Sequence, residues 1–128
     1  MISLLLLQAT LGPIGRQPLP ANGCAAYLWS MNAPRQLVAM AEPTRLRIQL
    51  DGRTLDLPRV TATGGAGLGL AATTRYAAGG VTATLDLALS DQTPVTQGAL
   101  VREATLTVEP SGRDVIVTPV GGMVGCNG

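Results

Sequence analysis

The sequence predicts an all-β domain, an antiparallel β-sandwich or small β-barrel of about eight strands with one disulfide that links its ends. Three observations support this fold class. Apolar and polar residues alternate with a period of two, turn signals separate the alternating segments at steady intervals, and two cysteines lie near the two ends of the domain. The 128 residues are enough for one domain, given roughly 100–200 residues per domain.

The alternation is clearest in Val81–Leu89. Its odd positions are all apolar, whereas Thr82, Thr84 and Asp86 stand at even positions. Successive side chains of a strand point to opposite faces, so one face is expected to pack on a core and the other to meet water.

A hairpin is predicted over residues 44–58. Asp51-Gly52 is a strong two-residue turn signal, because glycine tolerates the positive φ that a type I′ turn requires. The apolar positions of both strands then share one face, and a cross-strand ion pair on the other face contributes at most about 1 kcal/mol. The predicted partners are Leu50 with Arg53, Ile48 with Leu55, Leu46 with Leu57 and Arg47 with Asp56.

Two further hairpins are predicted from turns that contain glycine. Residues 68–77 pair with residues 80–89 around Ala78-Gly79, which places Tyr76 opposite Val81. Residues 104–109 pair with residues 113–118 through Pro110-Ser111-Gly112. This register has the pairs Val108 with Val115, Leu106 with Val117 and Glu109 with Asp114.

The two ends of the domain are expected to meet. Residues 24–30 and 36–41 fit strand or helix, and strand is favoured because Asn32-Ala-Pro34 and Glu42-Pro43 follow them at hairpin-like intervals. The tail, residues 120–126, is expected to pair with the strand that contains Cys24.

The first 21 residues are predicted to be a signal peptide followed by a Pro/Gly-rich tether, and residues 22–128 a single β domain. The apolar run at residues 1–11 is too short to span a bilayer, which takes about 20 residues. It fits the centre of a secretory signal, although no Lys or Arg precedes it and no Ala-x-Ala site follows. A periplasmic or secreted protein without a transmembrane span is therefore expected. The alternative is a buried N-terminal strand in a cytoplasmic protein.

A disulfide between Cys24 and Cys126 agrees with export, because such bridges persist in oxidising compartments. It would close a loop of about 100 residues and contribute about 4.7 kcal/mol in the chain-entropy model. One alternative is a pair of unrelated buried thiols. Another is lipid anchoring at Cys24, since Ala21-Asn22-Gly23-Cys24 distantly matches a lipoprotein signal box.

The composition argues against several classes of function. The net charge of +1 lacks the basic excess that a nucleic-acid surface needs. Histidine and lysine are absent, which removes His-based acid–base chemistry, Schiff bases and most metal sites. None of the serines lies in a Gly-x-Ser-x-Gly sequence. We assign no catalytic residue, metal or cofactor. The remaining enzymatic possibility is a pair of carboxylates that converge from different strands.

A run of glycines at residues 64–69 has the composition of a phosphate-binding loop. The P-loop pattern requires Gly-Lys-Ser/Thr after the glycines, and the dinucleotide pattern requires a helix after them. Here an alternating segment follows and lysine is absent. A loop or a bulged strand entry is expected instead.

Five residues are candidates for binding. Tyr27 and Trp29 lie two apart and share a face of a strand, where they form either a partner-binding patch or part of the core beside the disulfide. Arg45, Arg47 and Arg59 are expected to line one polar sheet face. The alternative for the arginines is compositional bias, because all nine basic residues are arginine.

The segment from Leu57 to Ala66 resembles the central segment of the periplasmic inhibitors of C-type lysozyme, which are small barrels. The resemblance covers about ten residues, and the Ser-x-Ser-Gly run and the aromatic residues that follow in that family are absent here. No residue role is carried over from that family.

The expected function is that of a small exported, non-enzymatic module that binds an unidentified protein or cell-envelope component through a sheet face or edge. The alternative is a structural or assembly domain that acts by strand pairing or oligomerisation. Apolar strands with few charged edges favour this second class.

Overall fold

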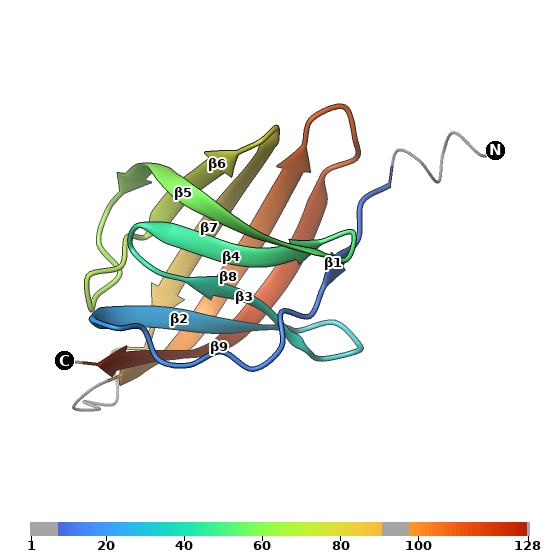
Figure 1. Cartoon of the computed structure of the whole chain (residues 1–128). Coiled ribbons are helices and arrows are strands. Elements are labelled where there is room, and N and C mark those ends of the chain that lie inside the picture. The colour runs from blue at the N-terminus through green and yellow to red at the C-terminus, as the bar shows by residue number, and fades with distance from the viewer. Residues whose placement is uncertain (1–7, 91–97, 128) are drawn as a thin grey trace.

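A computed structural model describes residues 8–90 and 98–127. Residues 1–7, most of the apolar run of the predicted signal, lie outside these residues, whereas the last residue of that run, Leu11, lies in a short strand. Eight strands close into an antiparallel barrel, and a short ninth strand, β1 (Leu11–Gly12), pairs with β4 outside the ring (Figure 1). The barrel strands are β2 (Gly23–Ser30), β3 (Leu37–Ala41), β4 (Arg45–Leu50), β5 (Arg53–Thr63), β6 (Thr73–Ala78), β7 (Val81–Leu89), β8 (Gly98–Pro110) and β9 (Ile116–Asn127).

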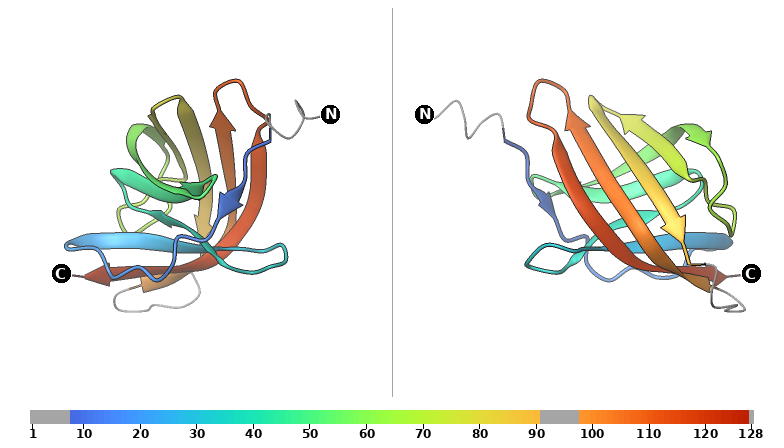
Figure 2. Two further views of the ribbon diagram at one scale, coloured as in Figure 1. Left: turned by 45° about the vertical axis from the view of Figure 1, so that its right-hand side comes forward. Right: turned by 180° about the vertical axis from the view of Figure 1, so that it is seen from behind.

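The barrel is an up-and-down meander. Each strand from β2 to β9 pairs with the next strand in the sequence, and β9 returns to pair with β2. The strands coil around a common axis, as the views turned by 45° and by 180° show (Figure 2). The predicted all-β class and the antiparallel pairing are confirmed, with a closed barrel rather than an open sandwich.

Inward-facing side chains fill the barrel, as expected for eight strands. The largest fully buried ones come from all around the ring and include Leu28, Leu46, Ile48, Leu57, Tyr76 and Leu106. The hydroxyl of Tyr76 donates a hydrogen bond to the carbonyl oxygen of Glu42 at 2.9 Å, so this buried polar group has a partner. Burial raises the pKa of Tyr76 to about 12.

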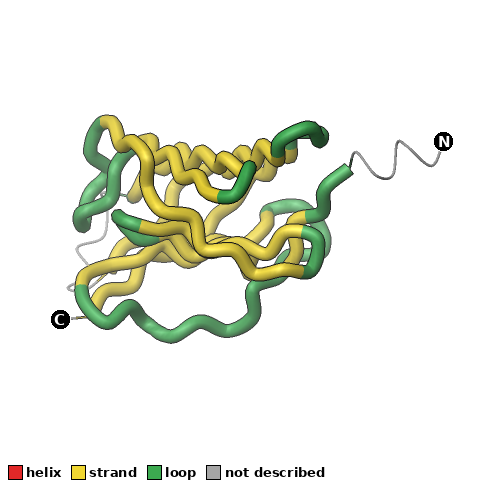
Figure 3. Tube along the Cα trace, turned by 45° about the horizontal axis from the view of Figure 1, so that its top comes forward, coloured by secondary structure: helices red, strands yellow, loops and turns green. Residues whose placement is uncertain are grey.

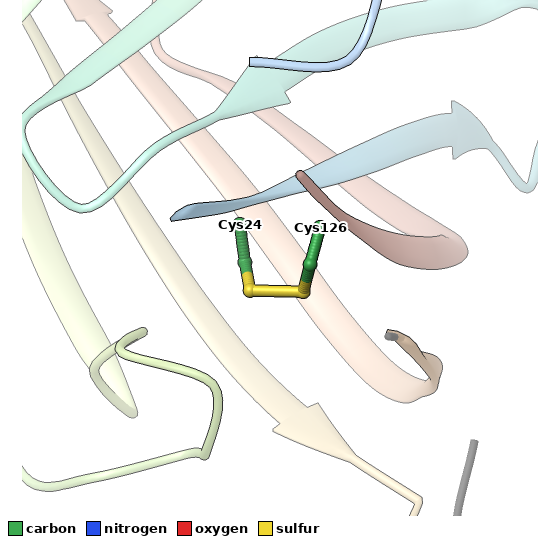
Figure 4. Close-up of a disulfide and its surroundings, with 2 residues drawn as sticks. All are labelled: Cys24 and Cys126. Atoms are coloured by element: carbon green, nitrogen blue, oxygen red, sulfur yellow. A yellow bond between two sulfur atoms is a disulfide. The ribbon is translucent and has the colours of Figure 1, made fainter. Parts of the chain in front are cut away.

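The barrel closes at the seam between β2 and β9. Eight consecutive residue pairs, from Gly23 with Asn127 to Ser30 with Val120, hold this seam in one register. Cys24 and Cys126 stand directly opposite each other and form the predicted disulfide (Figure 4). The predicted pairing of the C-terminal tail with the Cys24 strand is therefore confirmed.

The hairpin of β4 and β5 has the predicted register. Leu46 pairs with Leu57, Ile48 with Leu55 and Arg47 with Asp56. Asp51 and Gly52 form the turn with φ values of 52° and 80°. Both central residues therefore adopt the positive φ that a type I′ turn requires.

The hairpin of β6 and β7 differs from the prediction by two residues. Its turn is Gly79-Gly80, so Ala78 lies opposite Val81 and Tyr76 lies opposite Ala83. Two glycines at positive φ suit this turn better than the predicted Ala78-Gly79. The shift is even, so Tyr76 still faces the interior. The first strand begins only at Thr73, and residues 64–72 form a loop from which Leu70 reaches the core.

The predicted register of the β8–β9 hairpin was wrong by one residue. Val108 pairs with Ile116, and Thr107 pairs with Val117. A slip of one residue moves every side chain of a strand to the other face. Val115 and Val117 are accordingly 55% and 61% exposed, whereas Ile116 packs against the core.

The close approach at the seam generates a stability prediction. A Cβ atom at Gly122 would lie 1.9 Å from the backbone carbonyl oxygen of Tyr27, whereas a Cβ atom at Gly65 would meet open space. Overpacking typically costs about 1–3 kcal/mol. We expect Gly122→Ala to lower the free energy of unfolding in urea by at least about 2 kcal/mol, and Gly65→Ala to leave it nearly unchanged. Equal stability of the two variants would contradict the register of the seam.

Candidate functional site

A second apolar cluster lies on the outside of the barrel, over β2 and β3. Ala25, Tyr27 and Met40 are buried there, and Trp29 packs against them. Tyr27 and Trp29 share a face, as their spacing predicts. That face is the outer one, so Trp29 lies outside the barrel core rather than beside the disulfide.

The outer cluster is covered by the segment between β1 and β2. We call residues 13–20 the strap. The strap contains no helix or strand and runs along the outside of the barrel toward the end where the C-terminus lies (Figure 3). It contains three prolines, whose fixed φ and missing N–H groups explain why it does not extend β1.

The strap is anchored at its N-terminal end by the β4–β5 turn. Leu11 pairs with Leu50, and the Asp51 carboxylate accepts a hydrogen bond from the backbone N–H of Thr10 at 3.0 Å. Arg113, from the β8–β9 loop, forms an ion pair with Asp51 and donates to the carbonyl oxygen of Gln8 at 2.6 Å. The Arg113 hydrogen bond is the largest cause that lowers the pKa of Asp51.

Along its length the strap mainly accepts hydrogen bonds from donors on the barrel. The N–H of Ile14 donates to the carbonyl oxygen of Leu37 at 2.9 Å. The remaining bonds run from barrel side chains to strap oxygens: Tyr27 Oη to the Pro18 carbonyl at 2.8 Å, Arg47 Nη1 to Gln17 Oε1 at 2.8 Å, and Asn127 Nδ2 to the Pro20 carbonyl at 3.2 Å. Burial raises the pKa of Tyr27, and the nearby Glu42 carboxylate adds to this shift.

Two apolar side chains of the strap also pack against the barrel. Ile14 packs against the outer cluster. Leu19 lies over Gly125, where an added Cβ would be 2.8 Å from Leu19 Cδ2 and 3.5 Å from Tyr27 Cε1. The missing side chain at position 125 therefore provides the space that Leu19 occupies.

The outer face continues past the strap as an exposed apolar row. Tyr27 pairs with Met123, and Met123 pairs with Leu100, so these three side chains share one face across β2, β9 and β8. Met123 is 50% exposed and Leu100 is 52% exposed. We call Tyr27, Trp29, Leu100 and Met123, together with Leu19 of the strap, the outer apolar face.

An open groove of about 850 Å³ lies next to this face, across β7, β8 and β9. Its lining includes Met31, Gly121 and Gly122 beside the seam, and Arg102 and Glu103 at the bulge of β8. The bulge arises because Val101 and Ala104 pair with Gly122 and Val120, which leaves one extra residue on β8. The groove therefore joins apolar and charged groups at one edge of the outer apolar face.

The predicted arginine face is only partly formed. Arg47 holds Asp56 by two bonds, from Nε at 2.7 Å and from Nη2 at 3.1 Å, and Arg45 pairs with Glu42 at 2.7 Å. The hydrogen bond from Arg47 is the main cause that lowers the pKa of the Asp56 carboxyl. Arg59 follows Leu57 by two residues and stands on the opposite side of β5 from Asp56. The three arginines do not form one anion-binding surface.

Among the described residues, no group of three or more Cys, Asp and Glu side chains has the geometry of a metal site. The described part of the chain has no helix of the length and apolarity needed to cross a membrane. Comparison of the chain with models of protein families, with curated proteins and with solved structures found no match.

Sequence reasoning found Tyr27 and Trp29 but missed the residues that surround them. Ile14 and Leu19 lie in a segment without periodicity, which was interpreted as a tether. The available signal was that both are apolar residues between prolines and glycines. Leu100 and Met123 were missed because their outward direction depends on strand registers that the sequence leaves open.

The Arg47–Asp56 pair predicts a pH dependence. The folded-state pKa of Asp56 is lowered, so the pair stabilises the fold above the unfolded-state pKa of about 3.9 and loses this effect as pH falls through the lower, folded-state pKa. We expect Asp56→Asn to reduce the free energy of unfolding at pH 7 by a few tenths to about 1 kcal/mol, because both side chains are partly exposed.

The difference from wild type should shrink as the pH falls below the unfolded-state pKa of about 3.9, because protonation of Asp56 removes the charge that Arg47 binds. Urea titrations at pH 7 and pH 3 measure this difference in the free energy of unfolding. Asp114→Asn, at an exposed loop position, is the matched control. If Asp56→Asn lowers the free energy of unfolding by the same amount at both pH values, the charge of Asp56 does not contribute to stability.

Proposed function

We propose that this protein is a small exported, non-enzymatic module that binds a protein or cell-envelope component through the outer apolar face. The observation that carries the proposal is the exposed row of Leu100 and Met123 next to Trp29, outside the barrel. Contiguous apolar groups on a protein surface mark interaction sites more often than single exposed ones.

The architecture supports recognition on the outside of the barrel. Packed side chains fill the interior, and each barrel strand pairs with a neighbour on both sides. A closed barrel holds its outer side chains on a rigid frame, which lowers the ordering cost of binding. The disulfide supports an oxidising compartment and therefore export, and the net charge of +1 supports a partner other than nucleic acid.

Export would also enlarge the binding face. Cleavage of the predicted signal and tether, residues 1–21, would remove β1 and the strap together. Tyr27 and Met40, which are 8% and 4% exposed in the full chain, would then lose their cover. The proposed mature domain presents a continuous surface from β3 to β8.

The proposal is tested by measuring whether capture of an envelope component depends on the outer apolar face. Full-length protein is immobilised and exposed to an extract of the envelope of the source cells. We expect Leu100→Glu with Met123→Glu to reduce capture of the retained component at least tenfold, because two charges would have to be buried in an apolar contact. Val60→Glu, which is at a 57% exposed position on β5, is the matched control and should retain capture. Equal capture by both variants would refute a role for the outer apolar face.

Assembly of several copies is the second candidate function. The observation in its favour is the pair of exposed valines, Val115 and Val117, in the β8–β9 hairpin. Under this proposal, sedimentation velocity at rising protein concentration shows oligomers that Val117→Glu abolishes. A protein that stays monomeric at high concentration would exclude self-association.

A further inference from the structure

We call the surface that the strap covers the seat. The contacts of the strap show what kind of molecule the seat can bind. The seat consists of the outer sides of β2 and β3, with Arg47 on β4 and with Gly125 and Asn127 on β9. Its polar side chains, Tyr27, Arg47 and Asn127, all donate hydrogen bonds to the strap, and two of them donate to carbonyl oxygens of prolines. Proline has no N–H of its own, so a seat that supplies donors suits a segment rich in prolines.

Two apolar positions set the spacing of the occupant. Ile14 enters the cluster of Tyr27 and Met40, and Leu19 fills the space over Gly125. The polar contacts to Gln17 and Pro18 lie between them. The seat therefore fits an extended segment whose two apolar side chains are five residues apart. Carbonyl oxygens in or near the stretch between them accept the hydrogen bonds of the seat.

The face is larger than the strap that covers it. From Tyr27 and Leu19 it continues to Met123 and Leu100, which remain half exposed. An occupant that follows the same path and extends over these residues would bury more apolar surface than the strap does. Proline-rich segments dock in aromatic-lined grooves in this way, because their backbone is already restrained before binding.

We propose that the strap occupies the binding site for a segment of a partner protein. This partner segment is extended, apolar and contains proline, and it binds the same seat when the strap leaves it. This inference rests on the proposed function, in which the outer apolar face binds a partner. Because the strap is joined to β2 through Ala21 and Asn22, its effective concentration at the seat is on the order of millimolar. The intact chain is therefore blocked against weak partners, and removal or displacement of the strap opens the seat.

The test uses the full chain and a fluorescein-labelled synthetic peptide with the sequence of residues 12–21, Gly-Pro-Ile-Gly-Arg-Gln-Pro-Leu-Pro-Ala. Ile14→Asp with Leu19→Asp in the protein weakens the strap while leaving the seat intact. We expect fluorescence anisotropy to show at least tenfold tighter peptide binding to this variant than to wild type. Ile14→Ala with Leu19→Ala is a gentler version for use if the charged variant does not fold.

Two controls test recognition at the seat. Adding Tyr27→Phe to the weakened-strap variant removes the donor to the Pro18 carbonyl, and we expect about three- to tenfold weaker binding. A peptide with serine in place of its isoleucine and leucine should bind at least tenfold more weakly. Peptide binding that is equal in wild type and in a folded weakened-strap variant would overturn the inference, as would equal binding of the serine peptide.

This experiment separates the inference from the proposed function. If the weakened-strap variant captures an envelope component through Leu100 and Met123 but ignores the peptide, the inference fails and the proposed function stands. If the peptide binds through Tyr27 while capture is unaffected by charges at Leu100 and Met123, the seat is confirmed and the wider face is excluded.

Discussion

The pairing of β2 with β9 is the constraint on which the rest of the structure depends. These are the first and last strands of the barrel, and an eight-strand meander that failed to pair them would have two open edges. The disulfide between Cys24 and Cys126 lies within this seam and ties the two strands where the ends of the domain meet. The bridge restricts the unfolded chain over nearly the whole domain, which is where a cross-link contributes most in the chain-entropy model.

The same seam builds the candidate site. It places Tyr27 and Met123 opposite each other on the outside of the barrel, and β8 adds Leu100 to the row. The small residues of β9 allow close approach: Gly122 lies against the backbone of β2, and Gly125 leaves space for Leu19. Closure of the barrel and formation of the outer apolar face are therefore two results of one strand pairing, with the disulfide on the inner side and the aromatic residues on the outer side.

The sequence predicted the fold wherever a residue type dictates a local conformation. Asp51-Gly52 determines the register of its hairpin, because no neighbouring dipeptide is as well suited to the turn. The β8–β9 loop lacks such a determinant, and Val115, Ile116 and Val117 are all apolar, so alternation alone does not select the inward one. Five binding residues were predicted, of which Arg47 contacts the strap and the two aromatic residues, Tyr27 and Trp29, belong to the outer apolar face. Which face they occupy, and that residues 13–20 cover it, depends on contacts between segments far apart in the chain.

Native-state amide hydrogen exchange of the oxidised and the reduced protein tests the central role of the seam most directly. If closure holds the barrel together, the amides of β2 and β9 in the oxidised protein exchange only through global unfolding, with the same free energy as those of β7. Reduction should then lower the protection of all three strands together, by about 2–5 kcal/mol. Fast exchange of β2 and β9 through local opening, with β7 still fully protected in both states, would contradict this account.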